Sequence, residues 1–282
     1  MLLLRLISYL PFSVLYLISD FLFFVSYRLI KYRRTVVWGN LRNSFPEKSE
    51  AELRKIEREF YGCLCDYGVE TLKLLTIEKT ELSKRMHWNN PEILVPFLEK
   101  KQSVILLASH QFNWEWLLVS GSINLPMPVD FVYQKQSSNL FDKFADATRT
   151  RFGAFAIERQ QTARESVKRR GVTRAIANVA DQFPTFEKRY WTTFLSQETA
   201  FFQGISQLPM LTQCHVFFAP IKKVKRGYYQ ADLVQLASPP YTKGDNQVIE
   251  EYVKQVEHLI RQQPQNWLWS HARWKRKRQP NE

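Results

Sequence analysis

The first thirty residues limit most strongly how this 282-residue chain can fold, because they are mostly leucine, phenylalanine, isoleucine, valine and tyrosine. The segment from Leu6 to Tyr27 would form about 33 Å of helix, at about 1.5 Å per residue, which is long enough to cross a bilayer. No small-residue cleavage site follows it, which argues against a removable signal peptide. We therefore predict a membrane anchor over residues 1–34, with a buried core helix as the alternative.

Polar groups interrupt this apolar segment. An aspartate such as Asp20 costs roughly 3 kcal/mol at the centre of a bilayer if nothing satisfies it, and Pro11 disturbs a regular helix. At about 100° per residue, one arc of about 140° holds most of the polar side chains. They are Arg5, Ser8, Tyr9, Ser13, Tyr16, Ser19, Asp20, Ser26 and Tyr27. Such a helix spans the membrane or lies in its interface, and we expect its polar stripe to dock on the rest of the chain.

Two features indicate that the remainder of the chain, residues 35–282, faces the cytoplasm. Lys31, Arg33 and Arg34 follow the apolar segment, and basic residues at such a boundary mark the cytoplasmic side. The chain has only three cysteines, an odd number that is too small for a disulfide framework, so we interpret them as reduced thiols.

The pattern after the anchor predicts an α/β fold. Residues 49–75 carry apolar side chains at spacings of three, four and seven, as an amphipathic helix does. From residue 92 onward, helical and strand patterns alternate. Helices are expected near 92–100, 113–122, 138–150, 161–170 and 245–262, and strands near 103–109, 128–134, 173–180, 214–221 and 228–236. This order indicates a mainly parallel central sheet flanked by helices.

The chain carries a net charge of +13, which favours a polyanionic partner. Five of the six residues Arg273–Arg278 are basic. Beside an anionic membrane each would add about 1 kcal/mol of attraction, and an acidic partner protein is an equally good ligand. Nucleic acid is disfavoured because the sequence contains no recognisable nucleic-acid-binding module.

The sharpest local motif is a histidine followed by a glutamate five positions later. His110 closes the apolar strand 103–109, and Glu115 falls on the first turn of the next helix. Ligands bind at strand ends in open α/β sheets. A carboxylate on one imidazole nitrogen fixes the tautomer, so that the other nitrogen can accept a proton from an alcohol. Alone the spacing is a weak signal, and a structural histidine beside an exposed glutamate is the alternative.

Longer strings occur around this motif in a characteristic order. They are Asn-Leu-x-x-x-Phe-Pro at 40–46, Arg159 after Arg-Phe-Gly at 151–153, Ala-Asp-Gln at 180–182, Phe-Phe-Gln-Gly at 201–204, Arg-Gly-Tyr-Tyr at 226–229 and the tryptophan-rich 263–275. With them, residues 35–278 resemble the late acyltransferases of lipid A biosynthesis, within the lysophospholipid acyltransferase superfamily. The variant resembles that of Bacteroidetes-type bacteria more than the enteric one.

The resemblance implies a glycerol-phosphate acyltransferase-like fold in an enzyme of the bacterial inner membrane. It implies transfer of an acyl group from a thioester, on acyl carrier protein, to a hydroxyl of a lipid A precursor or related glycolipid. His110 would act as the general base and Glu115 would orient it. No metal and no dissociable cofactor is implied. The residues expected near the substrate are Asn113, Arg159, Asp181, Gln182 and Gly204, with Arg159 binding a phosphate or the oxyanion.

Departures from the family pattern leave the acceptor open. Ser206 stands where relatives often have a glutamate, and Ala272 replaces an arginine in the string His-Ala-Arg-Trp at 271–274. A lysophospholipid or aminolipid acceptor, an acyl-CoA donor, and an inactive protein that binds a membrane surface remain alternatives. We interpret His271 and the neighbouring tryptophans as packing residues, and Gly204 either as a substrate contact or as a point of close backbone approach.

Overall fold

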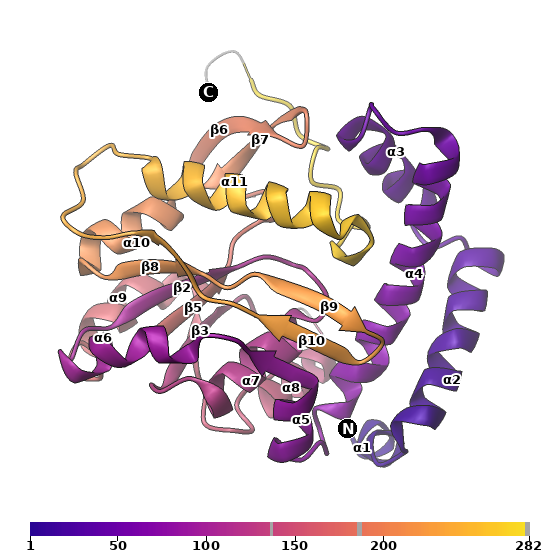
Figure 1. Ribbon diagram of the computed structural model, residues 1–282, viewed down its shortest axis with the longest axis horizontal. Coiled ribbons are helices and arrows are strands. Elements are labelled where there is room, and N and C mark those ends of the chain that lie inside the picture. The colour runs from indigo at the N-terminus through magenta and orange to yellow at the C-terminus, as the bar shows by residue number, and fades with distance from the viewer. Residues whose placement is uncertain (136–137, 185–187, 280–282) are drawn as a thin grey trace.

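The computed structural model describes residues 1–135, 138–184 and 188–279, and Figure 1 shows sheets covered by helices with an apolar helix at the N-terminal edge. The predicted α/β chain, with a multi-stranded sheet between helices, is confirmed.

The central sheet has six strands in the order β11-β8-β2-β5-β3-β4. Neighbours pair in parallel from β8 to β4, and β11 pairs antiparallel with β8. The strands are β2 (Val104–Ala108), β3 (Val129–Tyr133), β4 (Phe155–Glu158), β5 (Ala175–Val179), β8 (His215–Phe218) and β11 (Val234–Ala237). The interior strand β2 reads Val-Ile-Leu-Leu-Ala and is almost wholly buried, as expected for a strand covered on both faces.

Alternate side chains of β2 belong to two different cores. Ile105 and Leu107 pack with α11 (Gln247–Gln262) and α4 (Glu50–Lys73), whereas Leu106 packs with α7 (Trp114–Asn124). The period-two alternation of a strand therefore places α11 and α7 on opposite faces of the sheet (Figure 1). Further helices are α3 (Arg34–Ser44), α5 (Lys79–Arg85), α6 (Val95–Glu99), α8 (Asn139–Arg149), α9 (Thr162–Lys168) and α10 (Gly204–Thr212). The single turns η2 (Pro91–Leu94), η3 (Arg159–Gln161) and η4 (Pro264–Asn266) join them.

Two smaller sheets complete the fold. One has the order β1-β10-β9 and the other is the hairpin β6-β7. Their strands are β1 (Met86–Trp88), β6 (Arg189–Phe194), β7 (Gln197–Phe202), β9 (Ile221–Lys225) and β10 (Tyr228–Ala231). The single strand predicted over 228–236 is wrong, because β10 and β11 lie in different sheets. Asn90 fixes the break by bonding both the N–H and the carbonyl of Leu233.

The N-terminal segment is divided at Pro11. Helix α1 (Leu2–Ser8) ends before it, and α2 (Phe12–Phe23) continues into the π-helical turn η1 (Phe24–Leu29). The continuous helix expected from Leu6 is therefore wrong, because proline lacks the N–H that would continue the helical hydrogen bonds. Within the described part of the chain, only Phe12–Leu29 is long and apolar enough to cross a membrane, and just 17% of it is buried. That exposure argues against the core-helix alternative.

The polar stripe of this segment docks on the rest of the chain, as predicted. Helix α2 lies along α4 (Figure 1). Ser19 donates a hydrogen bond to Asp66 at 2.8 Å, and Asp20 forms an ion pair with Arg226 at 2.6 Å. The cost of placing an aspartate on this helix is therefore offset by a cation of the β9-β10 hairpin. The opposite side of the helix leaves large apolar side chains exposed, including Leu17, Phe21 and Phe24.

Candidate active site

Two adjacent parallel strands end where His110 and Asp181 meet. Ala108 of β2 is in register with Val179 of β5, and each chain continues two residues to one of the pair. The Asp181 carboxylate accepts hydrogen bonds from His110 Nδ1 at 2.5 Å and from the His110 backbone N–H at 2.9 Å. Trp267 Nε1 donates a third bond at 2.6 Å. Asp181 is only 1% exposed, so it is held in place from several sides.

These contacts keep the Asp181 carboxylate ionised. Burial opposes ionisation, but the His110 imidazole and the three donated hydrogen bonds outweigh it and lower the pKa of Asp181 to about 2. With the Nδ1 proton donated to Asp181, the His110 Nε2 carries the lone pair. The side-chain nitrogen of Gln182 lies 3.2 Å from that Nε2. This is the arrangement of a general base oriented by a carboxylate.

Glu115 has a different partner from the one expected. Instead of the imidazole, it binds Arg149 of α8, at 2.8 Å and 2.5 Å from its two oxygens, and accepts a bond from Trp114 Nε1 at 3.1 Å. Burial opposes ionisation here too, but the Arg149 guanidinium lowers the pKa of Glu115. The expectation that Glu115 orients His110 directly is therefore corrected, because Asp181 occupies that place.

The tryptophan-rich string 263–275 contacts the turn that carries His110 and Glu115, residues 110–115, which we call the catalytic turn. Asn266 accepts a bond from the Phe112 N–H at 2.8 Å, and the Leu268 N–H donates to the His110 carbonyl at 3.2 Å. Together with the Trp267 bond to Asp181, these contacts hold His110 and Asp181 in place. Interpreting the tryptophans as packing residues alone missed the Trp267 hydrogen bond, although the length of the string was a signal.

A pocket of about 900 Å³ opens beside His110. Its inner wall is apolar and includes Leu106, Leu117, Leu118, Leu125, Val129 and Phe131. Its polar side chains include His110, Glu115, Arg149, Arg159, Gln182 and His271. Five predicted site residues therefore line one cavity, namely His110, Glu115, Arg159, Gln182 and Gly204. The size and apolar lining of this cavity fit a long hydrocarbon ligand. In the described part of the chain, no group of three or more His, Cys, Asp or Glu side chains could hold a metal ion.

Two residues predicted to contact the substrate lie behind the pocket. Asn113 is fully buried, and its side-chain oxygen caps α7 by accepting from the Trp116 N–H at 3.1 Å. Its side-chain nitrogen donates to Glu70 at 3.0 Å. Asp181 is also shielded, by His110. Protein groups bind the polar atoms of both residues, so the structure shows them supporting the site from behind, and their place near the substrate stays a prediction.

Gly204 and Arg159 form one wall of the pocket with Phe202. A Cβ atom on Gly204 would lie 2.2 Å from the Phe202 ring, so glycine is required for this close approach. The Arg159 guanidinium lies 5.5 Å from the centre of the same ring and donates a hydrogen bond to Gln134 at 3.0 Å. Burial lowers the pKa of Arg159 from a value so high that the side chain stays cationic.

The basic C-terminal tail is shorter than its sequence indicates. Arg273 is fully buried, donates to the Ala200 carbonyl at 3.1 Å and stacks 4.1 Å from the centre of the Phe201 ring. Residues 275–279 are exposed. The exposed basic tail therefore begins at Lys275.

His271 lines the pocket as a neutral imidazole. Its Nδ1 is buried with no hydrogen-bond partner among the described residues. Burial, and then the charge of Arg273, lower the pKa of His271 to about 4. The site therefore presents one imidazole paired with a carboxylate and a second one held uncharged.

The low pKa of His271 predicts a loss of stability in mild acid. Between its ordinary pKa of 6.5 and the folded-state value of about 4, the unfolded chain binds more protons, so stability falls as the pH falls. We expect the free energy of unfolding to drop by about 2 kcal/mol more between pH 7 and pH 4.5 in wild type than in His271→Gln. Tryptophan-monitored denaturation at both pH values measures this; equal drops would contradict it. Asp181 acts in a separate window, below about pH 4.

The fold and the site place a histidine held by a buried carboxylate beside an apolar pocket large enough for a hydrocarbon chain. The chain belongs to the bacterial lipid A biosynthesis acyltransferase family, whose model matches residues 1–276. A comparison with curated protein sequences finds no match. Family membership and the apolar helix Phe12–Leu29 together indicate a membrane-associated acyltransferase of lipid A synthesis.

Proposed function

We propose that this protein transfers a fatty acyl group from an acyl thioester on acyl carrier protein to a hydroxyl of a lipid A precursor or related glycolipid. The observation that carries the proposal is the His110–Asp181 pair at the edge of a 900 Å³ apolar pocket. Family membership supports the reaction type.

The proposed chemistry uses both nitrogens of His110. Nε2 takes the proton of the acceptor hydroxyl as that oxygen attacks the thioester carbonyl carbon. The ionised Asp181 stabilises the resulting imidazolium through Nδ1. Collapse of the tetrahedral intermediate breaks the carbon–sulfur bond, and the imidazolium returns its proton to the thiolate. The products are an ester and a free thiol, so protons and electrons balance.

Polar groups around the pocket are proposed to bind the charged parts of the reactants. Gln182, next to Nε2, is placed to donate to the acceptor or the oxyanion, and Arg159 to bind a phosphate of the acceptor. Glu115 holds Arg149 in the pocket wall, and the Glu115 carboxylate itself lies within electrostatic reach of the His110 imidazole. The apolar inner wall would receive the acyl chain.

The surface suits an enzyme on the cytoplasmic face of the inner membrane. Residues 1–34 would anchor it through the exposed apolar side of α2, and residues 35–282 would form the catalytic domain with a glycerol-phosphate acyltransferase-like sheet. The exposed basic residues of the tail, Lys275–Arg278, would meet anionic lipid headgroups or the acidic carrier protein.

The Ser206 departure supports a second acceptor class, a lysophospholipid or aminolipid. The Ser206 hydroxyl is buried without a hydrogen-bond partner among the described residues, and it lies in α10, the helix that begins at Gly204 in the pocket wall. A serine in place of a carboxylate leaves this helix without that negative charge next to the pocket wall, which would favour a different acceptor headgroup. The intact His110–Asp181 pair argues against an inactive binding protein.

The decisive experiment offers the purified full-length protein two acceptors with one labelled donor. We expect label from acyl carrier protein to enter a lipid A precursor at least about 10-fold faster than a lysophospholipid, because a site that binds an acceptor's polar groups rejects analogues that lack them. A parallel reaction with acyl-CoA tests the donor. Faster labelling of the lysophospholipid would overturn the acceptor assignment. No ester product from either donor would overturn acyl transfer itself.

A further inference from the structure

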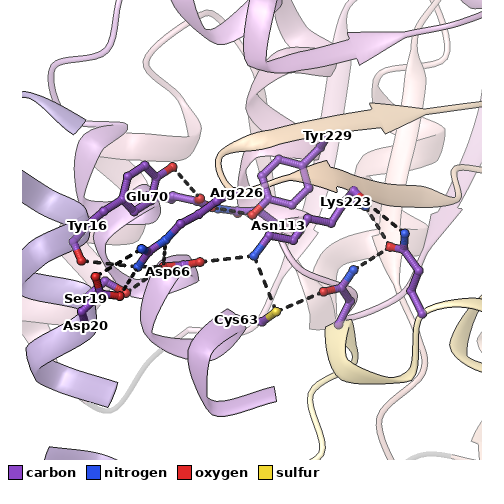
Figure 2. Close-up of polar contacts among 12 residues, drawn as sticks. Tyr16, Ser19, Asp20, Cys63, Asp66, Glu70, Asn113, Lys223, Arg226 and Tyr229 are labelled. Carbon is purple, nitrogen blue, oxygen red and sulfur yellow. Dashed lines mark hydrogen bonds and ion pairs between the residues drawn. The ribbon is translucent and has the colours of Figure 1, made fainter. Parts of the chain in front are cut away.

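A buried carboxylate outside the pocket lies beneath the turn that carries His110 and Glu115. Glu70 of α4 is fully buried. Its oxygens accept hydrogen bonds from Asn113 Nδ2 at 3.0 Å, from the Tyr229 hydroxyl at 2.7 Å and from the Tyr16 hydroxyl at 3.0 Å. Figure 2 shows these three side chains converging on Glu70 from the catalytic turn, strand β10 and helix α2. The proposed chemistry makes no use of this carboxylate.

Glu70 holds the start of α7 by two routes. Its side chain binds the nitrogen of Asn113, whose oxygen caps the helix at the Trp116 N–H. Its backbone carbonyl accepts a bond from Trp116 Nε1 at 2.8 Å. His110 lies three residues before Asn113 and Glu115 two residues after it, so the same contacts fix the segment that presents both side chains to the pocket.

A carboxylate is a costly choice for a purely structural role at this position. Burial raises the pKa of Glu70, and removing a charge from water costs several kcal/mol unless good partners satisfy it. Apolar residues of similar volume often stabilise a core as well as a buried ionic group does. The acceptor geometry of Glu70, which gathers three donors from three separate elements, is what an apolar residue cannot supply.

The third donor connects this support to the N-terminal helix. Tyr16 belongs to α2, the helix with the exposed apolar face. One turn earlier on α4, Asp66 binds Ser19 of the same helix and is paired with Arg226 and Lys223 of the neighbouring hairpin (Figure 2). Docking of α2 thus completes the hydrogen bonds of Glu70, and the same carboxylate contacts the anchor helix and the catalytic turn.

We propose that Glu70 is a positioning residue for the His110–Glu115 turn, and that Tyr16 of the docked N-terminal helix completes its hydrogen-bond set. This inference rests on the proposed acyl transfer. The position of His110 then depends on the docking of α2. If α2 is displaced, the pocket residues remain, but the turn that bears His110 loses part of its support.

The test compares three variants of the full-length protein in phospholipid nanodiscs. Glu70→Gln keeps the shape but replaces one acceptor oxygen by a donor, and Tyr16→Phe removes only the α2 contact. Glu57→Gln is the matched control, since Glu57 is equally buried on α4 but is paired with Arg34 instead of the catalytic turn. Amide hydrogen exchange of residues 110–117 and the kcat and KM of acyl transfer are measured for each.

We expect Glu70→Gln to lower kcat about 10- to 100-fold with the donor KM within about 2-fold, because misplacement of a catalytic group by about 1 Å has costs of this order. Exchange in 110–117 should rise. Tyr16→Phe should change both in the same direction by a few fold, and Glu57→Gln should leave both within about 2-fold of wild type. If Glu70→Gln does not fold, Tyr16→Phe and Tyr229→Phe carry the test.

Amide hydrogen exchange is measured without the acyl-transfer reaction, so it tests the positioning role of Glu70 separately from the proposed function. Unchanged protection of 110–117 in Glu70→Gln would overturn the positioning role whatever the activity. Equal losses in Glu57→Gln would also overturn it, because the effect would then be one of general stability. Raised exchange in Glu70→Gln supports the positioning role even if the wild type transfers no acyl group to any tested lipid, a result that counts against the proposed function alone.

Discussion

His110→Ala is expected to lower the kcat of acyl transfer about 10³- to 10⁴-fold. The alanine removes the imidazole that connects the buried, ionised Asp181 with the pocket, so the acceptor hydroxyl loses its proton acceptor. General acid–base catalysis contributes about 10²- to 10⁴-fold in enzymes, and the upper part of that range applies because His110 handles the proton in both steps. Acyl transfer from labelled acyl carrier protein under saturating donor measures kcat directly.

The control for this substitution is a second histidine remote from the pocket. His258 is exposed on α11 and contacts Gln262 of the same helix, so His258→Ala should leave kcat within about 2-fold of wild type. Thermal denaturation of both variants separates loss of chemistry from loss of fold. Retention of more than a tenth of the wild-type kcat by folded His110→Ala would show that His110 is structural and that another group accepts the proton.

Local periodicity was enough to predict most of the elements. The spacing of Leu53, Ile56 and Phe60 predicted α4, and the apolar segment 103–109 predicted β2. Both were predictable because apolar residues recur along a sequence with the period of the helix or strand whose faces they bury. The same periodicity predicted that the polar side of α2 packs against the rest of the chain. The β6-β7 hairpin was not predicted, since neither of its strands is uniformly buried or regularly alternating.

The pairing within the site depended on contacts that a linear pattern does not contain. His110 was found because it ends a recognisable strand. The contact with its partner Asp181 depends on the adjacency of β2 and β5, which are separated by three α-helices and two strands in the chain. Glu115 was favoured as the partner of His110 because it is close in sequence. In the structure Glu115 instead binds Arg149 of α8, the next α-helix along the chain. Trp267 reaches Asp181 across 86 residues, a contact that only the fold reveals.

Two buried carboxylates lie beside His110 and Arg149 at the site, and Asp181→Asn is expected to cost far more activity than Glu115→Gln. Asparagine keeps the shape of Asp181 but cannot stabilise an imidazolium, and its amide favours the tautomer in which Nε2 carries the proton. We expect kcat to fall about 10³- to 10⁴-fold, by analogy with the loss of the orienting aspartate in other His–Asp pairs. Because the pKa of Asp181 is about 2, its ionisation should not shape the wild-type kcat profile above about pH 4.

Glu115→Gln should instead lower kcat by about 10-fold and the free energy of unfolding by about 2 kcal/mol, because the Arg149 guanidinium loses its buried counterion while His110 keeps its own. Measuring kcat and chemical denaturation for both variants distinguishes a carboxylate that orients the base from one that holds the pocket wall. If Glu115→Gln loses as much kcat as Asp181→Asn at unchanged stability, then Glu115 acts on the imidazole during turnover. The ion pair with Arg149 would in that case describe only the resting site, to be exchanged for the histidine when substrate binds.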